Sequence, residues 1–254
     1  MQPISTGNHH PEGSQVPSSL SRQEILLTKL VGELGGNYSS GLGIDLASLQ
    51  SDEVFKWFLA SMLLGVNIRQ SVAIRAYQEF EKAGVLSPER LLTTDWQSLV
   101  DILDRGGYVI YNFKTAIGLT EVAWTLNQQY QGDLNRLHFF TNDELDLEKR
   151  LRALGERVTP AVVKLFLREM RGLWEKAEPP LTKDVLLALE RLGLADTTSP
   201  VLALEELRIR WEDSKINQTQ FSVLETALTK LGKSYCRKMK CDKCPVRVEC
   251  QTGF

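Results

Sequence analysis

Residues 236–250, CRKMKCDKCPVRVEC, carry every cysteine of this 254-residue chain, in the spacing C-x4-C-x2-C-x5-C. The four thiolates can share one centre only if the backbone between them wraps around it. Iron–sulfur clusters are held by closely spaced cysteines in this way. The spacing therefore predicts a 4Fe–4S cluster, with a terminal helical domain built around the ligands Cys236, Cys241, Cys244 and Cys250.

Two other interpretations of these cysteines stay open. Structural zinc is more often held by two separated knuckles, each with its own C-x2-C step, whereas this stretch contains a single such step. Disulfides are typical of small secreted scaffolds, and this segment belongs to a long chain of ordinary composition. Zinc is thus the alternative metal, and disulfides are the less favoured third interpretation.

The bulk composition is that of a soluble globular protein, with 43% apolar and 24% charged residues. No apolar run reaches the roughly 18 residues of a membrane span. Residues 1–19 lack the apolar segment of a secretory signal, so we expect a disordered arm there and a cytoplasmic, nucleoid-associated protein. His9 and His10 lie in that arm, which leaves only His138 for the folded part, so catalysis by a histidine base is not expected.

Charge is distributed unevenly along the chain. The formal net charge of −2 argues against nucleic-acid binding, but residues 233–250 carry six cations against Asp242 and Glu249. A simpler interpretation is that these charges keep an exposed loop soluble. The basic patch consists of Lys233, Arg237, Lys238, Lys240, Lys243 and Arg247.

Apolar residues recur at helical spacing along nearly the whole chain, without sustained alternation, so the predicted fold class is all-α. A Pro-rich turn at residues 178–180 interrupts the chain. We expect one helical domain at residues 50–176, and a second that combines residues 20–49 with 177–254. The predicted helices are Arg22 to Leu34, Val54 to Leu64, Ile68 to Ala83, Trp96 to Leu103, Asn112 to Tyr130, Leu145 to Leu154, Pro160 to Trp174, Lys183 to Leu192, Val201 to Trp211 and Gln220 to Leu231.

A short turn links two of these helices at residues 154–161, LGERVTPA. Thr159 suits the N-cap position and Pro160 the first helical turn, where its missing N–H costs nothing. Amides at a helix start carry partial positive charge and can receive a phosphate. Arg157 and Lys164 add cations nearby, so this hairpin is a candidate DNA contact, although such linkers are common in helical proteins.

The hairpin, its distance from the cysteine loop and the helices before it together resemble the endonuclease III family of helix–hairpin–helix DNA glycosylases. The likeness covers roughly residues 22–250, and the runs that carry it are LGKSYC at 231–236, CDKCPV at 241–246, SMLLGVN at 61–67 and GYVIYNFK at 107–114. It implies a six-helix barrel domain and an iron–sulfur cluster domain. Double-stranded DNA with a damaged or mismatched base would bind between them, with that base flipped out for hydrolysis of its N-glycosidic bond.

Several residues receive roles from this resemblance. In the hairpin, Val158 aligns with the central valine, Arg157 and Thr159 replace two glycines, and Ala161 replaces the lysine nucleophile. A Schiff-base lyase reaction at this position is therefore not expected, and the implied enzyme is monofunctional. The loop also has four residues between its first two cysteines, where the family pattern has six.

The catalytic role has three candidate residues, two carboxylates and one hydroxyl. Thr182 occupies the position of the family aspartate, Asp184 follows two residues later, and Glu175 lies in the same linker. An alternative role for Asp184 is that of a first-turn acid favoured by the helix dipole. We expect Tyr108 and Tyr111 to line the base pocket, with burial in the core as the alternative.

Asn67 falls where the family has a glutamine that fills the gap left by the flipped base, and its alternative role is to cap the helix from Ile68. The leading hypothesis is a monomeric base excision repair glycosylase. A non-catalytic lesion-binding protein of the same fold is the second hypothesis. A zinc-stabilised helical interaction module is the third.

Overall fold

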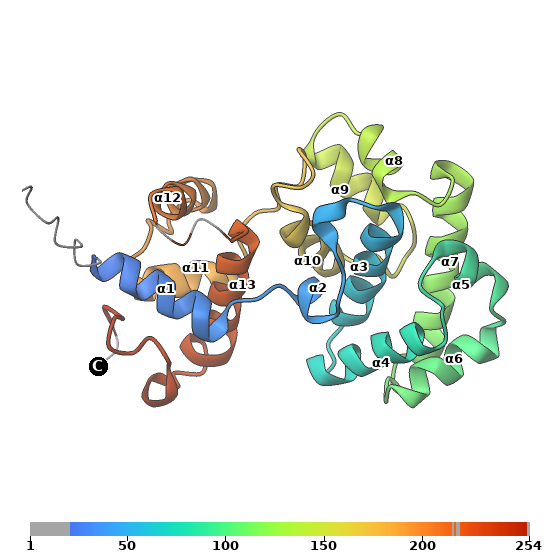
Figure 1. Ribbon diagram of the computed structural model, residues 1–254, viewed down its shortest axis with the longest axis horizontal. Helices are drawn as coiled ribbons and strands as arrows, with labels where there is room; N and C mark the ends of the chain where they lie inside the picture. Colours follow the sequence, from blue (N-terminus) through green and yellow to red (C-terminus); the bar gives the residue numbers. More distant parts are fainter. Residues whose placement is uncertain (1–20, 215, 217–218, 253–254) are drawn as a thin grey trace, which may run out of the picture.

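Helices form the regular structure of the computed structural model, which describes residues 21–214, 216 and 219–252 (Figure 1). Within these residues there is no strand, and the only β-type pairing is an isolated bridge between Arg171 and Trp174. The all-α prediction is confirmed. No described helix combines the length and the hydropathy of a membrane-spanning segment. The predicted arm at residues 1–19 lies outside the described residues.

The larger lobe is built around a buried aromatic and aliphatic core. Phe58 and Phe166 pack edge to face with ring centroids 5.1 Å apart, and Trp57 Nε1 donates a hydrogen bond to the backbone oxygen of Phe166 at 3.1 Å. These contacts fix α10 against α3, and so place the hairpin before α10. The helices of this lobe are α2 (Tyr38–Gly41), α3 (Ser51–Leu64), α4 (Gln70–Lys82), α5 (Pro88–Thr93), α6 (Trp96–Arg105), α7 (Asn112–Tyr130), α8 (Leu134–Phe139), α9 (Glu144–Arg152) and α10 (Pro160–Met170).

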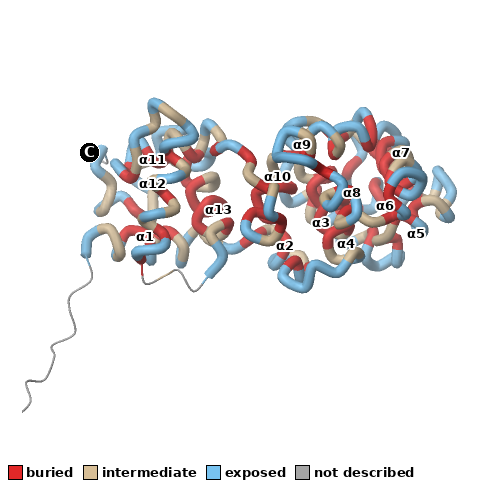
Figure 2. Tube along the Cα trace, turned by 90° about the horizontal axis from the view of Figure 1, so that it is seen from above, coloured by how far each residue is buried: buried red, intermediate tan, exposed pale blue. Residues whose placement is uncertain are grey.

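The smaller lobe packs α1 (Arg22–Leu34) against the last helices of the chain around a second buried core, and Figure 2 shows buried segments on several of these helices. Ser21 and Glu24 form a capping box at the start of α1. The other helices of this lobe are α11 (Lys183–Leu192), α12 (Pro200–Glu212) and α13 (Phe221–Leu231).

The division between the lobes differs from the predicted one near the N-terminus. Ile44 and Leu46 were assigned to the smaller domain, but both are buried in the core of the larger lobe. Their side chains reach that core because α2 folds back beside α3 after the chain crosses between the lobes (Figure 1). The crossover therefore lies near residues 35–37, before α2.

Charged side chains at the end of α10 join the lobes. Arg168 Nη1 donates a hydrogen bond to Thr229 Oγ1 of α13 at 3.5 Å. Within the larger lobe, the Glu169 carboxylate holds the start of α2 by accepting from the backbone N–H groups of Tyr38 at 2.9 Å and Ser39 at 3.0 Å. Arg171 Nε lies 3.1 Å from Glu225 Oε2 on α13. Because Arg171 and Glu225 are both buried, loss of either one leaves an uncompensated charge, which costs about 3–5 kcal/mol.

Candidate nucleic-acid interface

The four cysteines converge at the end of the smaller lobe. Their side chains line a cavity of about 330 Å³ together with Arg191, Tyr235 and Met239. All four cysteines are half-buried, and none of them forms a disulfide bond in this structure. Within the described residues, no three His, Cys, Asp or Glu side chains are grouped closely enough to hold a single metal ion.

The chemistry of these thiols fits a cationic group in that cavity. Burial raises the pKa of Cys236 to about 11, and the neighbouring Cys244 and Cys250 thiolates add to this shift. Burial also raises the pKa of Cys244. Thiolates gathered in a partly dry pocket repel one another, and iron or another metal cation offsets that repulsion by binding them in the deprotonated form.

Backbone hydrogen bonds wrap the cysteine loop around this cavity. A turn of π-helix at Gly232–Cys236 follows α13, and the N–H of Lys240 returns to the Tyr235 oxygen at 3.0 Å. Gly232 is required here because a Cβ at this position would lie 2.0 Å from the backbone oxygen of Asp184. Val246 is the loop's buried apolar anchor in the lobe core.

The start of α11 packs against the same loop. Thr182 is the N-cap of α11 and accepts a hydrogen bond from Val185 N at 3.3 Å, as its sequence position predicts. Asp184 forms an ion pair with Arg237 of the cysteine loop. Both candidate catalytic side chains thus have structural partners in the smaller lobe, and Asp184 ties α11 to the basic loop.

Glu175 lies apart from these two residues. It is exposed in the turn after α10, next to Trp174, whose ring stacks on His138 at 4.6 Å between centroids. Burial lowers the pKa of His138, and Lys176 lowers it further, whereas the Glu175 carboxylate raises it. The structure therefore groups Glu175 with His138 rather than with Asp184.

The basic patch lies on the surface of the loop. Lys233, Lys238 and Lys240 are exposed, and Arg237 is more than half exposed while it contacts Asp184. At the far end of the loop, Arg22 and Lys29 of α1 bind Glu249, so the loop is attached to the lobe at both ends. The contacts are Arg22 Nη2 to Glu249 O at 3.3 Å and Lys29 Nζ to Glu249 Oε1 at 3.1 Å.

In the hairpin, Thr159 caps α10 and accepts a hydrogen bond from Val162 N at 3.3 Å, as predicted. Val158 was proposed as a DNA contact, but its side chain is buried in the core and its N–H donates to Gly155 O at 3.0 Å. The Thr159 N–H donates to Arg157 O, also at 3.0 Å. The N–H groups of Val158 and Thr159 are thus both used within the turn itself, so neither of these two amides is available to a phosphate.

Two close packing contacts hold the hairpin beside α3 and α7. A Cβ on Gly118 of α7 would lie 2.3 Å from Arg157 Cγ, and a Cβ on Gly65 would lie 2.6 Å from Val162 Cγ2. The Arg157 stem thus lies on a helix groove that only glycine leaves open. The half-buried Lys164 follows one turn along α10.

The loops at residues 65–69 and 106–111 lie at the same end of the larger lobe. Asn67 is exposed in the first loop, and it does not cap α4, because the N-cap is Arg69 and the helix begins at Gln70. In the second loop Ile110 is 83% exposed. The sequence did not predict this exposed apolar loop tip, because Val109 and Ile110 are of residue types that usually lie in the core.

The two tyrosines of the second loop differ in their positions. Tyr108 is fully buried and its hydroxyl donates to the backbone oxygen of Leu63 at 3.0 Å, so the expected pocket-lining role is wrong. Burial raises its pKa to about 12. Tyr111 is half-buried, packs edge to face against Tyr108 with ring centroids 6.4 Å apart, and remains near the loop surface.

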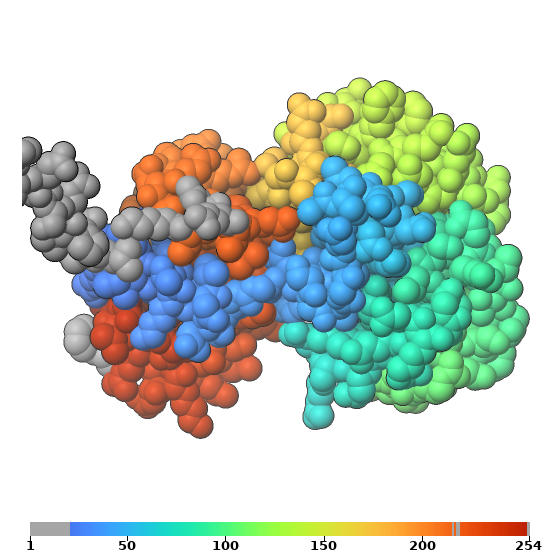
Figure 3. Space-filling model, viewed as in Figure 1, coloured from blue at the N-terminus to red at the C-terminus, as the bar shows by residue number. Residues whose placement is uncertain are grey.

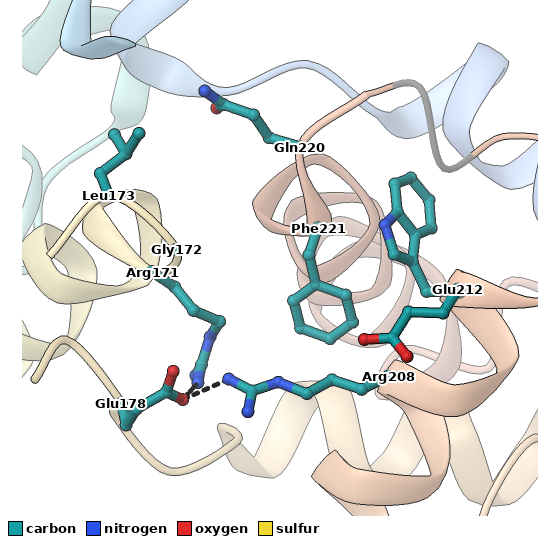
Figure 4. Close-up of a pocket in the computed structure, with 9 residues that line it drawn as sticks. Arg171, Gly172, Leu173, Glu178, Arg208, Glu212, Gln220 and Phe221 are labelled. Atoms are coloured by element: carbon teal, nitrogen blue, oxygen red, sulfur yellow. Dashed lines mark hydrogen bonds and ion pairs between the residues drawn. The ribbon is translucent and has the colours of Figure 1, made fainter. Parts of the chain in front are cut away.

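A cavity of about 430 Å³ lies between the lobes where the chain leaves α10 (Figure 4). Arg171 and Arg208 both point toward Glu178, which pairs with each of them, and Phe221 forms part of the wall. Because Glu178 pairs with both arginines and Glu225 also pairs with Arg171, two carboxylates balance the two cations, and this cavity is a structural junction rather than an anion site.

A second cavity between the lobes has a volume of about 470 Å³ and is lined by residues that include Tyr38, Gln70, Ile74 and Lys230. Figure 3 shows a notch between the red C-terminal segment and the cyan start of α4. Burial lowers the pKa of Lys230, and Arg168 lowers it further. The sequence did not predict that these residues share a cavity, because each of them is typical of a surface or core position in its own helix or loop.

No protein-family model and no curated protein matches the sequence. Solved structures do match the fold. A trapped endonuclease III–DNA covalent intermediate, in an estranged-adenine complex, matches with a TM-score of 0.51 and 15% identity over 92% of this chain and 98% of that one. A thermostable thymine-DNA glycosylase matches with a TM-score of 0.53 and 13% identity over 91% of this chain and 96% of that one.

These matches show that the chain shares its fold with endonuclease III and with the thymine-DNA glycosylase, as the resemblance in its sequence predicts. They cover more than nine-tenths of this chain and therefore extend across both lobes. At such low identity they establish the architecture and leave the chemistry to be argued from the residues.

Proposed function

We propose that this protein is a base excision repair glycosylase that binds double-stranded DNA at a damaged or mismatched base and hydrolyses the N-glycosidic bond. The observation that carries this proposal is the convergence of the hairpin with the loops at 65–69 and 106–111, on a fold shared with DNA glycosylases. The basic cysteine loop adds a positively charged surface on the other lobe. We further propose a monomer that acts in the cytoplasm, associated with the nucleoid.

The proposed cofactor is a 4Fe–4S cluster held by the four cysteines. Their common cavity of about 330 Å³ and their free, half-buried thiols support it. When bound, the cluster would supply a cationic cross-link for a loop that has little apolar packing of its own. Its proposed role is structural, since the loop positions the exposed Lys233, Lys238 and Lys240.

Phosphate contacts are proposed for two groups of side chains. Arg157 and Lys164 of the hairpin would bind one segment of the backbone, and the lysines of the cysteine loop with Arg237 would bind another. Such contacts position the duplex but carry no base information. Asn67 and Ile110 project from neighbouring loops, where an amide can fill the gap left by a displaced base and an apolar side chain can wedge between base steps.

For the chemical step we propose water as the nucleophile, because Ala161 stands where the hairpin amine would be. A carboxylate near the sugar would stabilise the oxocarbenium-like transition state. Asp184 is the proposed group, with Thr182 beside it at the start of α11, and it forms an ion pair with Arg237 of the cysteine loop. Glu175 is the alternative acid. Tyr111, near the loop surface, is the remaining pocket candidate from the sequence.

The second candidate function is lesion binding without hydrolysis. The specific observation in its favour is that Asp184 is engaged by Arg237, in a chain that also lacks the hairpin lysine.

One assay separates the two functions. Base release is measured on a panel of lesion-containing duplexes for the parent, Asp184→Asn and Thr182→Ala. The glycosylase proposal expects release by the parent and a loss of about 10²-fold or more in Asp184→Asn. Release that both variants retain contradicts the site assignment. Tight lesion binding with no release from any duplex supports the non-catalytic function.

A further inference from the structure

The 470 Å³ cavity between the lobes has the size and composition of a binding site for one planar molecule. Its volume lies within the range of about 300–1,000 Å³ typical of ligand pockets. Each lobe contributes to it: Gln70 and Ile74 come from α4, and Lys230 comes from α13. Gln70 directly follows the loop at 65–69, so the cavity opens beside the proposed DNA surface.

Lys230 gives this cavity a directed hydrogen-bond donor. Its ammonium donates to the backbone oxygens of Gly35 at 3.0 Å and Gly36 at 3.4 Å, in the linker between α1 and α2. An ammonium group has three donors, so within the described residues one is left for a ligand. The same group lies 5.5 Å from the centroid of the Tyr38 ring, which holds it in place.

Gln70 adds further donors. The Tyr38 hydroxyl donates to Gln70 Oε1 at 3.4 Å, which directs the amide nitrogen of Gln70 away from that hydroxyl. Ile74 and the Tyr38 ring supply apolar surface on which a flat ring can pack. The cavity thus presents N–H donors beside an apolar surface.

We propose that this cavity receives the displaced nucleobase, and that Lys230 with Gln70 selects bases that present carbonyl oxygens where adenine and cytosine present an amino group. This inference rests on the proposed function and specifies its substrate class. An exocyclic amino group on the base would place its N–H donors next to the Lys230 ammonium, which is also a donor. A carbonyl oxygen at the same position would accept a hydrogen bond from the ammonium. A polar group of the site that is left without a hydrogen-bond partner costs far more binding free energy than the loss of an apolar contact.

The test uses two matched pairs of target bases that differ in one exocyclic group: the lesions 5-hydroxyuracil and 5-hydroxycytosine opposite a common base, and hypoxanthine and adenine, both mismatched opposite guanine. Affinity for each duplex is measured with the cluster-containing protein. The parent is expected to prefer the carbonyl member of each pair by about tenfold. Lys230→Met and Gln70→Leu should bring this ratio toward one, and Lys230→Arg should retain most of it.

The control is Lys82→Met at the exposed end of α4, which should keep the parental ratio. Circular dichroism and the visible spectrum of each variant show whether fold and cluster are intact. Equal affinity for the two members of each pair, or an unchanged ratio in both Lys230→Met and Gln70→Leu, overturns the inference. Failure of the parent to distinguish any lesion duplex from undamaged DNA instead overturns the proposed function.

Discussion

The two lobes achieve a fixed shape by different means. The larger lobe buries Trp57, Phe58 and Phe166 in one continuous apolar core, so its surface loops stand on a rigid base. The smaller lobe has a helical core too, but its last segment, residues 237–252, contributes only Val246 to it as a buried side chain. Apolar burial thus supports the hairpin in the larger lobe, whereas the basic loop has little apolar burial of its own, and the proposed cluster would supply a cross-link at its thiols.

The largest effect is expected from breaking that cross-link. Cys241→Ser, or removal of metal by a chelator, should release the loop, since metal binding in small structural sites contributes on the order of 10 kcal/mol. Hydrogen exchange read by mass spectrometry should show fast exchange at residues 232–252 and unchanged protection in α3 and α10. An equal increase in hydrogen exchange in both lobes would show that the two lobes depend on the thiol cross-link to the same degree.

The next largest effect concerns the core of the larger lobe. Phe166→Ala should lower the free energy of unfolding by about 3–5 kcal/mol, because it removes a fully buried ring that packs against Phe58. Phe139→Ala is the matched control, since this ring is 79% exposed, and its effect should stay within about 0.5 kcal/mol. Urea denaturation measures both, and similar losses in the two variants would refute the assigned core.

A smaller effect sharpens the role of the loop tip. Ile110→Ala should weaken binding to a lesion duplex by about tenfold, because an apolar side chain inserted between base steps offsets part of the free energy of unstacking. The free energy of unfolding should stay unchanged. Leu145→Ala is the control, because Leu145 is similarly exposed on α9. Fluorescence anisotropy gives the affinities. Equal affinities for parent and Ile110→Ala would remove Ile110 from the interface.

The smallest effect separates charge from packing at the hairpin. Arg157→Met keeps the aliphatic stem on Gly118 but removes the cation, so it should weaken binding about threefold for all sequences and lower the salt slope by about 1. Arg157→Ala should in addition lower the melting temperature. A sequence-selective loss in Arg157→Met would contradict a phosphate contact.

Much of the fold follows from local patterns in the sequence. Helical periodicity gives the class, and Thr159 and Thr182 mark helix starts because a hydroxyl at the N-cap binds a free amide. The cysteine spacing brings the four thiols to one cavity because the loop is short. The start of α4 was misplaced by two residues, since the loop after Gly65 continues to Arg69.

The remaining features depend on contacts between distant segments. From the sequence, Tyr108 is expected to lie in a loop, yet its hydroxyl donates a hydrogen bond to the backbone oxygen of Leu63 in the core. The cavity that contains Lys230 forms only when α13, α4 and the α1–α2 linker meet. Such convergence is set by packing across the lobes, and no single stretch of sequence carries a signal for it.

The most direct test of the central claim is a measurement of iron, acid-labile sulfide and zinc in protein purified without oxygen. We predict about four iron and four sulfide atoms per chain, with a broad absorption near about 400 nm. Stoichiometric zinc, or colourless protein without metal and with the loop still protected, would contradict the account.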